Sequence, residues 1–368
     1  MIGGQGLPLS QILINGAQMD LGKFTDLPSA LGFAPNKQGQ ISKDQLFEVF
    51  GKLPKFPTDF QLERGRSIDH DGVKITELSW STGYGPRTQS YLLVPAEADG
   101  PLPGVLFLHS HDDVKGYGKE KLVEGGKSMP AEYNWLRRDH YGDRAPANVL
   151  AKRGYAVLTF DCFMWGSRNF SMDEMPERLI EILGVKEYER LAVMHESMVL
   201  SKYLSLFGTT LAGLLNFDDR VAFEVAKSLP EIGDKIAVMG LSGGGCRTIY
   251  MHATVDEIAA SVSVGAMATY ESMIDKHVAG HSWMFWPMNL AKYGDWPAVA
   301  MMGAPKPLYV QYCGNDQLFT KQGMKDVDDY FIKNYPAGKY KGSTYPVLHS
   351  FTAQMQDDAF DWLDANVK

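Results

Sequence analysis

Residues 235–250 read KIAVMGLSGGGCRTIY, and this stretch decides the fold. Ile236–Met239 form a short apolar run that is too brief for a helix and typical of a buried strand. Glycines flank Ser242, and Cys246–Tyr250 can continue as a helix. A strand, a sharp glycine turn with serine at its apex and a helix form the context that a nucleophile elbow requires. The stretch therefore predicts Ser242 as a nucleophile at the carboxyl end of a sheet, beside the first free amides of a helix.

Composition limits the class of protein. The 368 residues allow one large domain with insertions or two smaller domains, and an apolar content of 45% supports a substantial core. The net charge of −8 and the lack of any block of consecutive basic residues argue against nucleic acid or an anionic membrane as the main partner. No run approaches the roughly 18 apolar residues of a membrane helix.

The cysteines and the N-terminal residues indicate the cellular compartment in which the protein is expected. Cys162, Cys246 and Cys313 are odd in number, far apart and without a CxxC pair, which predicts buried free thiols in a reducing compartment. The first residues show neither the basic nor the apolar region of a signal peptide. We therefore expect a cytoplasmic protein, and a leader outside this sequence would allow secretion.

The chain divides into an arm and a main domain. Residues 1–66 are rich in Gly, Pro and polar residues and predict an N-terminal arm packed on the main domain, with a helix around Ser42–Phe50 capped by its serine. Residues 67–368 form the main domain, which opens with an antiparallel hairpin of Val73–Trp80 and Gln89–Val94.

Short apolar strands then alternate with helices, which predicts an α/β fold with a mostly parallel central sheet covered by helices on both faces. A long helical region, Met172–Phe207, lies inside a helical insertion at about 165–215 that is predicted to form a cap. In such sheets ligands bind outside the carboxyl ends of the strands. The polar residues that end the predicted strands are His109, Asp161, Ser242 and Asp316.

A serine nucleophile needs a base, and the base needs an acid to orient it. Ser242 is followed by Asp316, just past an apolar strand, and by His349 before the last helix, which is the order Ser–Asp–His. His277 and His281 precede the acid and break that order. The alternatives for the three residues are an incidental loop serine, a turn aspartate in Gly-Asn-Asp and a helix-capping histidine.

An oxyanion hole requires two backbone donors aimed at the developing negative charge. One is expected from the amide of Gly243, the residue after the nucleophile. The second is expected from the loop that follows the strand ending at Leu108, at the amide of His111. His109 is expected to shape this loop rather than to transfer protons.

In this order the motifs PLPGVLFLHSH, RGYAVLTFDCFMWGSR, GLSGGG, CGNDQLF and LHSF are similar to the α/β-hydrolase superfamily. Over about residues 70–367 the chain resembles the dienelactone-hydrolase-like and acetyl-xylan-esterase-like bacterial serine esterases. The resemblance implies the α/β-hydrolase fold and a serine mechanism without a cofactor. It assigns nucleophile, acid and base to Ser242, Asp316 and His349. Ser110 stands where the family usually has glycine, and Ser242 where true dienelactone hydrolases have cysteine.

A metal site is the competing hypothesis. His109, His111 and Asp113 match H-x-H-x-D, a spacing that suits zinc at a strand end, although Val114 stands where the fuller motif has a histidine. A metal-dependent hydrolase is therefore an alternative. A binding scaffold without activity is another, because a fold alone does not give activity.

We expect hydrolysis of a carboxylic ester, such as an acetylated carbohydrate or a small-molecule ester, through an acyl-serine intermediate. Peptidase, lactonase and C–C hydrolase activities use the same triad and stay open. Candidate substrate-binding residues are Trp283 and Trp286, in the aromatic-rich stretch Tyr270–Met302, and Phe163. A core position under a long loop is the alternative for these aromatics, and homo-oligomerisation is left open.

Overall fold

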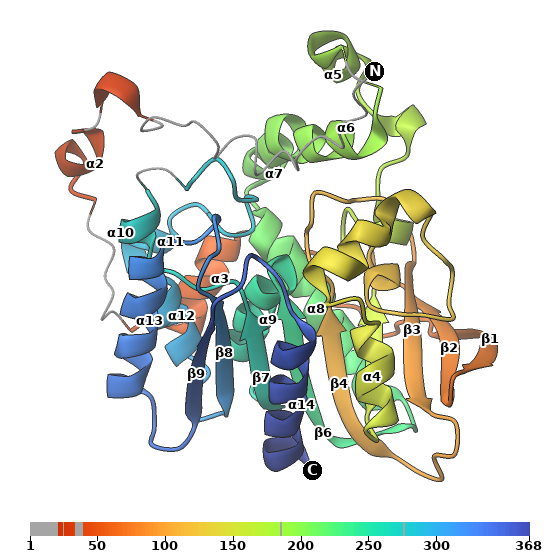
Figure 1. Cartoon of the computed structure of the whole chain (residues 1–368). Helices are drawn as coiled ribbons and strands as arrows, with labels where there is room; N and C mark the ends of the chain where they lie inside the picture. The colour runs from red at the N-terminus through yellow and green to blue at the C-terminus, as the bar shows by residue number, and fades with distance from the viewer. Residues whose placement is uncertain (1–20, 25, 34–39, 185, 275–276) are drawn as a thin grey trace.

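A central sheet crosses the whole molecule (Figure 1). The computed structural model describes residues 21–24, 26–33, 40–184, 186–274 and 277–368. Within them the strand order is β1-β2-β3-β5-β4-β6-β7-β8-β9. The strands are β1 (Glu63–His70), β2 (Val73–Trp80), β3 (Thr88–Pro95), β4 (Leu102–Leu108), β5 (Ala156–Phe160), β6 (Ile232–Leu241), β7 (Ile258–Val264), β8 (Leu308–Cys313) and β9 (Tyr340–Tyr345). From β5 to β9 every pairing is parallel, whereas β1, β2 and β3 pair antiparallel, as does β3 with β5. The predicted α/β class with a mostly parallel sheet is confirmed.

Alternate side chains of each strand enter two separate cores. In β4, Leu106 and Leu108 belong to one hydrophobic cluster, and Val105 and Phe107 belong to the other. This division follows from the two-residue period of a strand. All four are at most 1% exposed, because helices cover both faces of the sheet. The buried part of β4 therefore reads as a continuous apolar run.

The helices form the two outer layers. On one face lie α4 (Pro146–Lys152) and α14 (Ala353–Val367), and on the other lie α8 (Leu211–Ser228) and α9 (Gly243–Thr254) (Figure 1). The remaining helices and turns of the main domain are η2 (Lys119–Lys121), η3 (Ala131–Tyr133), η4 (Leu136–His140), α10 (Tyr270–Met273), α11 (Leu290–Tyr293), α12 (Trp296–Met301) and α13 (Lys321–Asn334). In the part of the chain that the structure describes, no helix is both long and apolar enough to cross a bilayer.

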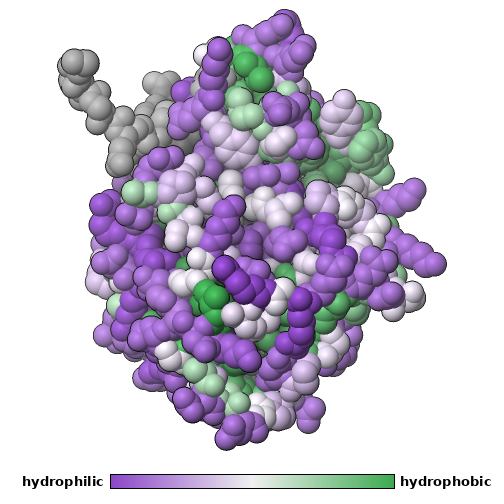
Figure 2. Space-filling view, turned by 90° about the vertical axis from the view of Figure 1, so that its right-hand side faces the viewer, coloured by the Kyte–Doolittle hydropathy of each residue, from purple (hydrophilic) through white to green (hydrophobic). Residues whose placement is uncertain are grey.

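The antiparallel edge is larger than the predicted hairpin. β1 adds a strand that begins at Glu63, ahead of residue 67, and its sequence ERGRSIDH lacks the apolar alternation by which a strand is recognised. Most of its side chains are exposed, and the side of the molecule at this edge is mostly hydrophilic (Figure 2). Charged side chains on an edge strand oppose pairing with another chain.

The helix predicted in the N-terminal arm is α3 (Lys43–Phe50). Its capping box joins the Gln45 amide to Ser42 Oγ at 3.2 Å and the Ser42 amide to Gln45 Oε1 at 2.9 Å, as the sequence predicted for Ser42. Leu46 and Phe50 are fully buried, and the helix packs on α8. The first 20 residues lie outside the described residues, and the division of the chain at residue 66 stays a prediction. Two short elements, η1 (Gly22–Phe24) and α2 (Leu27–Ala30), precede α3.

The predicted helical region between β5 and β6 lies above the sheet (Figure 1). It contains η5 (Gly166–Arg168), η6 (Met172–Glu174), α5 (Glu177–Leu183), α6 (Tyr188–His195), η7 (Glu196–Leu200) and α7 (Ser201–Phe207). It has a small apolar cluster of its own, in which Met175, Leu179 and Leu191 are buried. We call Met172–Phe207 the cap segment below. α8 then starts at Leu211.

Candidate active site

Ser242 occupies a strained turn between β6 and α9. Its φ of 57° and ψ of −119° are sparsely populated for a residue with a side chain. Two hydrogen bonds hold it: the Ser242 amide donates to Val264 O at 2.8 Å, and the Cys246 amide donates to Ser242 O at 2.8 Å. The side chain is half-buried. This backbone conformation is the sharp strand-to-helix turn that the sequence predicted.

The elbow requires glycine because α9 passes very close to the end of β4. A Cβ on Gly244 would lie 2.1 Å from Leu108 O, and one on Gly240 would lie 2.6 Å from the same oxygen. Both distances are shorter than any real contact, so no side chain fits at either position. Arg247 on α9 adds a buried ion pair to Asp219 on α8, with Nε 3.0 Å from Oδ2. The elbow is thus fixed against both β4 and α8.

Asp316 and His349 form the hydrogen-bonded pair that the sequence predicted. The two atoms, His349 Nδ1 and Asp316 Oδ2, are 2.6 Å apart. Asp316 follows β8, and its other oxygen accepts from the Leu318 amide at 2.8 Å. The Leu318 amide is thus a second donor to the carboxylate, and it holds the carboxylate in one orientation toward the ring. His349 follows β9, a strand that the sequence did not predict, because its YKGSTY run is polar and only partly buried.

The His349 ring lies beside the elbow. A Cβ on Gly265 would lie 3.5 Å from Nδ1 and Cε1 of His349, and Gly265 follows the Val264 carbonyl that binds the Ser242 amide. On its other side the ring stacks near Phe319, with centroids 6.2 Å apart. Nε2 of His349 is buried and, among the described residues, has no hydrogen-bond partner. The ring is therefore oriented through Nδ1, and Nε2 stays available to accept a proton.

Charge sets the protonation of this ring. Burial acts to lower the pKa of His349, but the charge and hydrogen bond of Asp316, together with the charge of Asp112, raise the pKa above its ordinary value. Asp316 thus stabilises the imidazolium form and fixes the tautomer with hydrogen on Nδ1.

The loop after β4 brings His111 to the elbow. A Cβ on Gly243 would lie 3.2 Å from both the amide nitrogen and Cβ of His111, so His111 lies close beside Gly243. Gly243 is the first residue of α9, and its own amide has no partner within the helix. The two amides predicted for an oxyanion hole are therefore neighbours. Asp112 and Asp113 adopt φ of 57° and 56°, a left-handed turn that aspartate tolerates better than most residues.

A fully buried lysine holds this turn in place. Lys121 Nζ donates to three carbonyls of the loop, those of Ser110 at 2.9 Å and of His111 and Val114 at 3.0 Å. It also lies 3.3 Å from Asp112 Oδ2. An ammonium group has three donors, and here all three are used. Since the carbonyls converge on Lys121, the loop is fixed in the shape that places the His111 amide against Gly243.

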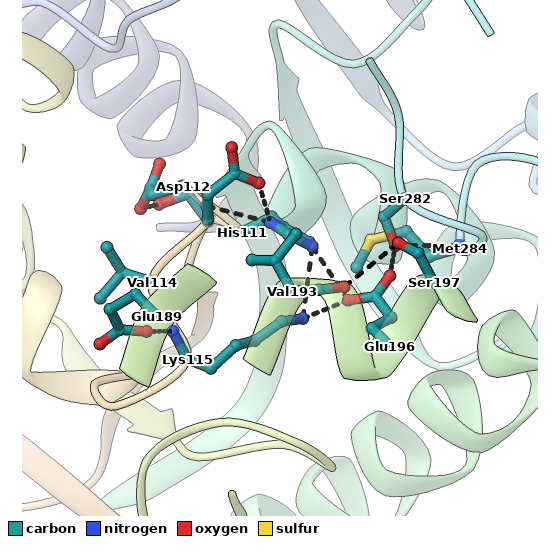
Figure 3. A network of polar contacts seen from close by, with 12 residues as sticks. His111, Asp112, Val114, Lys115, Glu189, Val193, Glu196, Ser197, Ser282 and Met284 are labelled. Atoms are coloured by element: carbon teal, nitrogen blue, oxygen red, sulfur yellow. Dashed lines mark hydrogen bonds and ion pairs between the residues drawn. The ribbon is translucent and has the colours of Figure 1, made fainter. Parts of the chain in front are cut away.

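The His111 side chain belongs to a polar network that joins the loop to the cap segment (Figure 3). Nε2 of His111 is 3.1 Å from Glu196 Oε2, and Lys115 Nζ forms an ion pair with the same oxygen. The other Glu196 oxygen accepts from Ser282, whose Oγ accepts from the Met284 amide at 3.2 Å. Burial acts to raise the pKa of Glu196, but Lys115 and His111 lower it. Glu196 thus joins the cap segment to the loop after β4, through His111 and Lys115, and to Ser282.

The histidines proposed as metal ligands point to different partners. Nδ1 of His109 is 3.0 Å from Ser110 O and its Nε2 is 3.5 Å from Cys162 Sγ, whereas His111 contacts Glu196 and Asp113. Burial lowers the pKa of His109 well below its usual value. Among the described residues, no group of three or more His, Cys, Asp or Glu side chains is arranged to hold a metal ion. His109 is buried and makes its contacts within the loop and with Cys162.

Asp161, at the end of a predicted strand, and the competing base His281 both make structural contacts. Asp161 is fully buried and accepts from the Lys119 amide at 3.0 Å and the Ser167 amide at 2.9 Å, so it shapes a loop. His281 donates from Nε2 to Leu318 O at 2.8 Å, and burial lowers its pKa to about 4. His277 lies just after α10. The three cysteines are free and buried, as predicted.

The contacts of the aromatic candidates are with residues other than Ser242, Asp316 and His349. Trp283 is 48% exposed. Trp286 stacks on Tyr270 with centroids 4.9 Å apart, and Phe163 packs between Tyr84 and Phe170. Met284 instead approaches the elbow, because its Sδ would lie 3.3 Å from a Cβ on Gly243.

Several residues of the site were not singled out from the sequence. Lys121 belongs to Lys119-Glu120-Lys121, a charged triplet that is typical of a solvated surface and yet is buried. Glu196 and Met284 carry no local signal, because they reach the site only through tertiary packing. Phe319 belongs to the motif CGNDQLF, three residues after Asp316, and that proximity was the available signal.

Comparisons with known proteins place this geometry in context. No family model matches the chain. A curated protein of Bacillus subtilis, named "Putative hydrolase YtaP", is 23% identical over 316 residues, which cover 85% of this chain and 93% of that protein. Among solved structures, a "putative acetyl xylan esterase" from Bacteroides fragilis is similar with a TM-score of 0.61 and 16% identity, over 88% of this chain and 82% of that one. A glucuronoyl esterase from Solibacter usitatus is similar with a TM-score of 0.57 and 14% identity, over 100% and 99%. These likenesses confirm the predicted α/β-hydrolase fold.

Lys121→Met removes the ammonium group while keeping most of the side-chain volume. It leaves three buried carbonyls and the Asp112 carboxylate without their donor, so we expect the free energy of unfolding to fall by about 3–5 kcal/mol. Urea unfolding followed by fluorescence measures the change. The exposed Lys127, changed to Met, is the matched control and should stay within ~0.5 kcal/mol of the wild type. A Lys121→Met protein as stable as this control would contradict the role given to Lys121.

Proposed function

We propose that this protein is a serine hydrolase that cleaves carboxylic esters through an acyl-Ser242 intermediate. One observation carries the proposal: the Asp316–His349 pair packs at Gly265, directly beside the strained turn that presents Ser242. The solved structures of similar fold are described as esterases, and the curated relative is named a hydrolase, which supports the same reaction.

In the proposed mechanism Nε2 of His349 accepts the Ser242 hydroxyl proton as Oγ attacks the ester carbonyl carbon. The tetrahedral intermediate collapses when the imidazolium returns that proton to the leaving alcohol. A water molecule then loses a proton to His349 and attacks the acyl carbon, and the proton passes back to Ser242 Oγ as the acid product leaves. Asp316 stabilises the imidazolium in each half of the cycle.

The negative charge that develops on the carbonyl oxygen needs donors already in position. We assign this role to the amides of Gly243 and His111, two residues that lie close together. The Lys121 ammonium behind the loop adds a positive charge that costs no reorganisation during the reaction.

The substrate is proposed at the level of chemical class. An acetylated carbohydrate or a small-molecule ester agrees with the printed descriptions of the similar structures, which include an acetyl xylan esterase and a glucuronoyl esterase. Lactonase, peptidase and C–C hydrolase activities would use the same three residues and stay alternatives. A cytoplasmic location stays a prediction from the free thiols.

A panel of p-nitrophenyl esters with short acyl chains tests the reaction. Ser242→Ala should lower kcat/KM by at least about 10³-fold, because the attacking oxygen is removed. Ser228→Ala, an exposed serine at the end of α8, should leave the rate unchanged. Equal rates in the wild type and Ser242→Ala, together with loss of activity to a chelator, would instead favour the metal-dependent alternative.

The pH profile tests the base. Only the neutral imidazole can accept the serine proton, so kcat/KM should rise with pH along a limb that reports the pKa of His349. Because that pKa is raised, the limb should lie above about pH 6.5. Asp316→Asn removes the negative charge, so the limb should move to lower pH while the rate falls about 10³–10⁴-fold. A limb that does not move in Asp316→Asn would contradict the assignment of this acid and base.

A further inference from the structure

A second imidazole–carboxylate pair lies beside the first. Nδ1 of His140 is 2.7 Å from Asp112 Oδ1. His140 ends η4, and its backbone is held because its carbonyl accepts from the Phe351 amide at 2.7 Å. The Asp112 side chain is 1% exposed, and the residue belongs to the same loop as the His111 amide. The pair therefore joins η4 to the proposed oxyanion loop.

The His140 ring stands close to the proposed base. Its centroid is 6.4 Å from that of His349, with the two rings nearly perpendicular at 88°. Trp135 packs edge-on against the ring at 5.3 Å and limits its movement. The His140 side chain is still 16% exposed, so it is reachable from solvent. The ring thus has a fixed orientation at the accessible side of the site.

The partners of Asp112 decide what this ring can bind. Oδ2 of Asp112 accepts from Ser110 Oγ and lies 3.3 Å from Lys121 Nζ, so a buried ammonium already balances the carboxylate charge. A neutral imidazole that donates from Nδ1 to Oδ1 carries its lone pair on Nε2. Among the described residues no hydrogen-bond partner is found for Nε2 of His140, and this atom can accept a hydrogen bond from a hydroxyl group.

The distance to His349 indicates where that hydroxyl group lies. The leaving alcohol oxygen must come within about 3 Å of His349 Nε2 to receive its proton. A hydroxyl group on the neighbouring carbon lies about 3 Å further on, and a hydrogen bond from it spans roughly another 3 Å. The His140 ring, whose centroid is 6.4 Å from that of His349, is therefore within reach of the second hydroxyl group of a vicinal diol.

We propose that His140, oriented by Asp112, accepts a hydrogen bond from a hydroxyl group adjacent to the scissile ester in the alcohol part of the substrate. His140 is a specificity-determining residue, and it selects monoesters of vicinal diols over esters of simple alcohols. This inference rests on the proposed ester hydrolysis, and it adds to it the chemistry of the leaving alcohol.

Two acetates that differ by one hydroxyl group test the proposal: 2-hydroxyethyl acetate and ethyl acetate. The measured quantity is the ratio of their kcat/KM values. His140→Asn keeps an amide N–H in the place of Nδ1 for Asp112 and lacks any atom in the place of Nε2. The wild type should favour the hydroxylated ester, and in His140→Asn the ratio should fall by about five- to tenfold, with the larger part of the change in KM.

Matched variants separate binding from folding. His140→Gln places a side-chain amide where Nε2 stands and should recover part of the ratio. Arg138→Gln, an exposed residue of the same turn, should leave the ratio unchanged. An unchanged ratio in His140→Asn, a wild type that does not distinguish the two esters, or equal losses on both esters would each overturn the proposal. Failure of the ester hydrolysis itself is a different result, because Ser242→Ala would then hydrolyse both acetates at the wild-type rate.

Discussion

The close passage of α9 against the end of β4 is the constraint on which the site depends. There is no room for a side chain at Gly240 or Gly244. Because both residues are glycine, α9 can pass this close to β4, and the turn between β6 and α9 holds Ser242 at a φ of 57°. The same contact places the first amide of α9 next to the loop that follows β4. One steric condition thus fixes both the serine and the neighbouring amides, and the sheet supplies the rigid platform on which such strain can be kept.

Buried charged side chains then hold the loops that follow the strands, whose shape the sheet alone does not determine. Lys121 binds three loop carbonyls, Glu196 joins the loop to the cap segment, and Arg247 pairs with Asp219 beneath the elbow. Buried ions are costly to desolvate, so pairs of this kind stabilise little in net terms and act mainly by permitting one arrangement. Here that arrangement is the loop geometry around the His111 amide. The desolvation cost is offset because each charged group named here has a hydrogen-bond or ion-pair partner at close range.

The sequence was sufficient for features that rest on local pattern. The elbow, the buried strands β4 to β8 and the Asp316–His349 pair could be predicted, because apolar runs, glycine turns and residue order are local or sequential signals. β1 and β9 could not be predicted, since both are polar strands whose pairing depends on a neighbour. Lys121 and His140 could not be predicted for a similar reason. Lys121 lies in a charged triplet and His140 ends the run Arg-Arg-Asp-His, and both runs are typical of a surface. Only tertiary packing places these two side chains at the site.

The central claim is that Ser242 is the nucleophile, activated by its surroundings. Labelling with a fluorophosphonate, followed by peptide mass spectrometry, tests it most directly, because the reagent bonds to a serine oxygen only when a base and an oxyanion site activate it. The account predicts a single adduct on the peptide that contains Ser242, with activity lost in proportion to labelling. An enzyme that keeps its esterase activity while Ser242 is fully labelled, or an inactivated enzyme whose only adduct lies elsewhere, would contradict it.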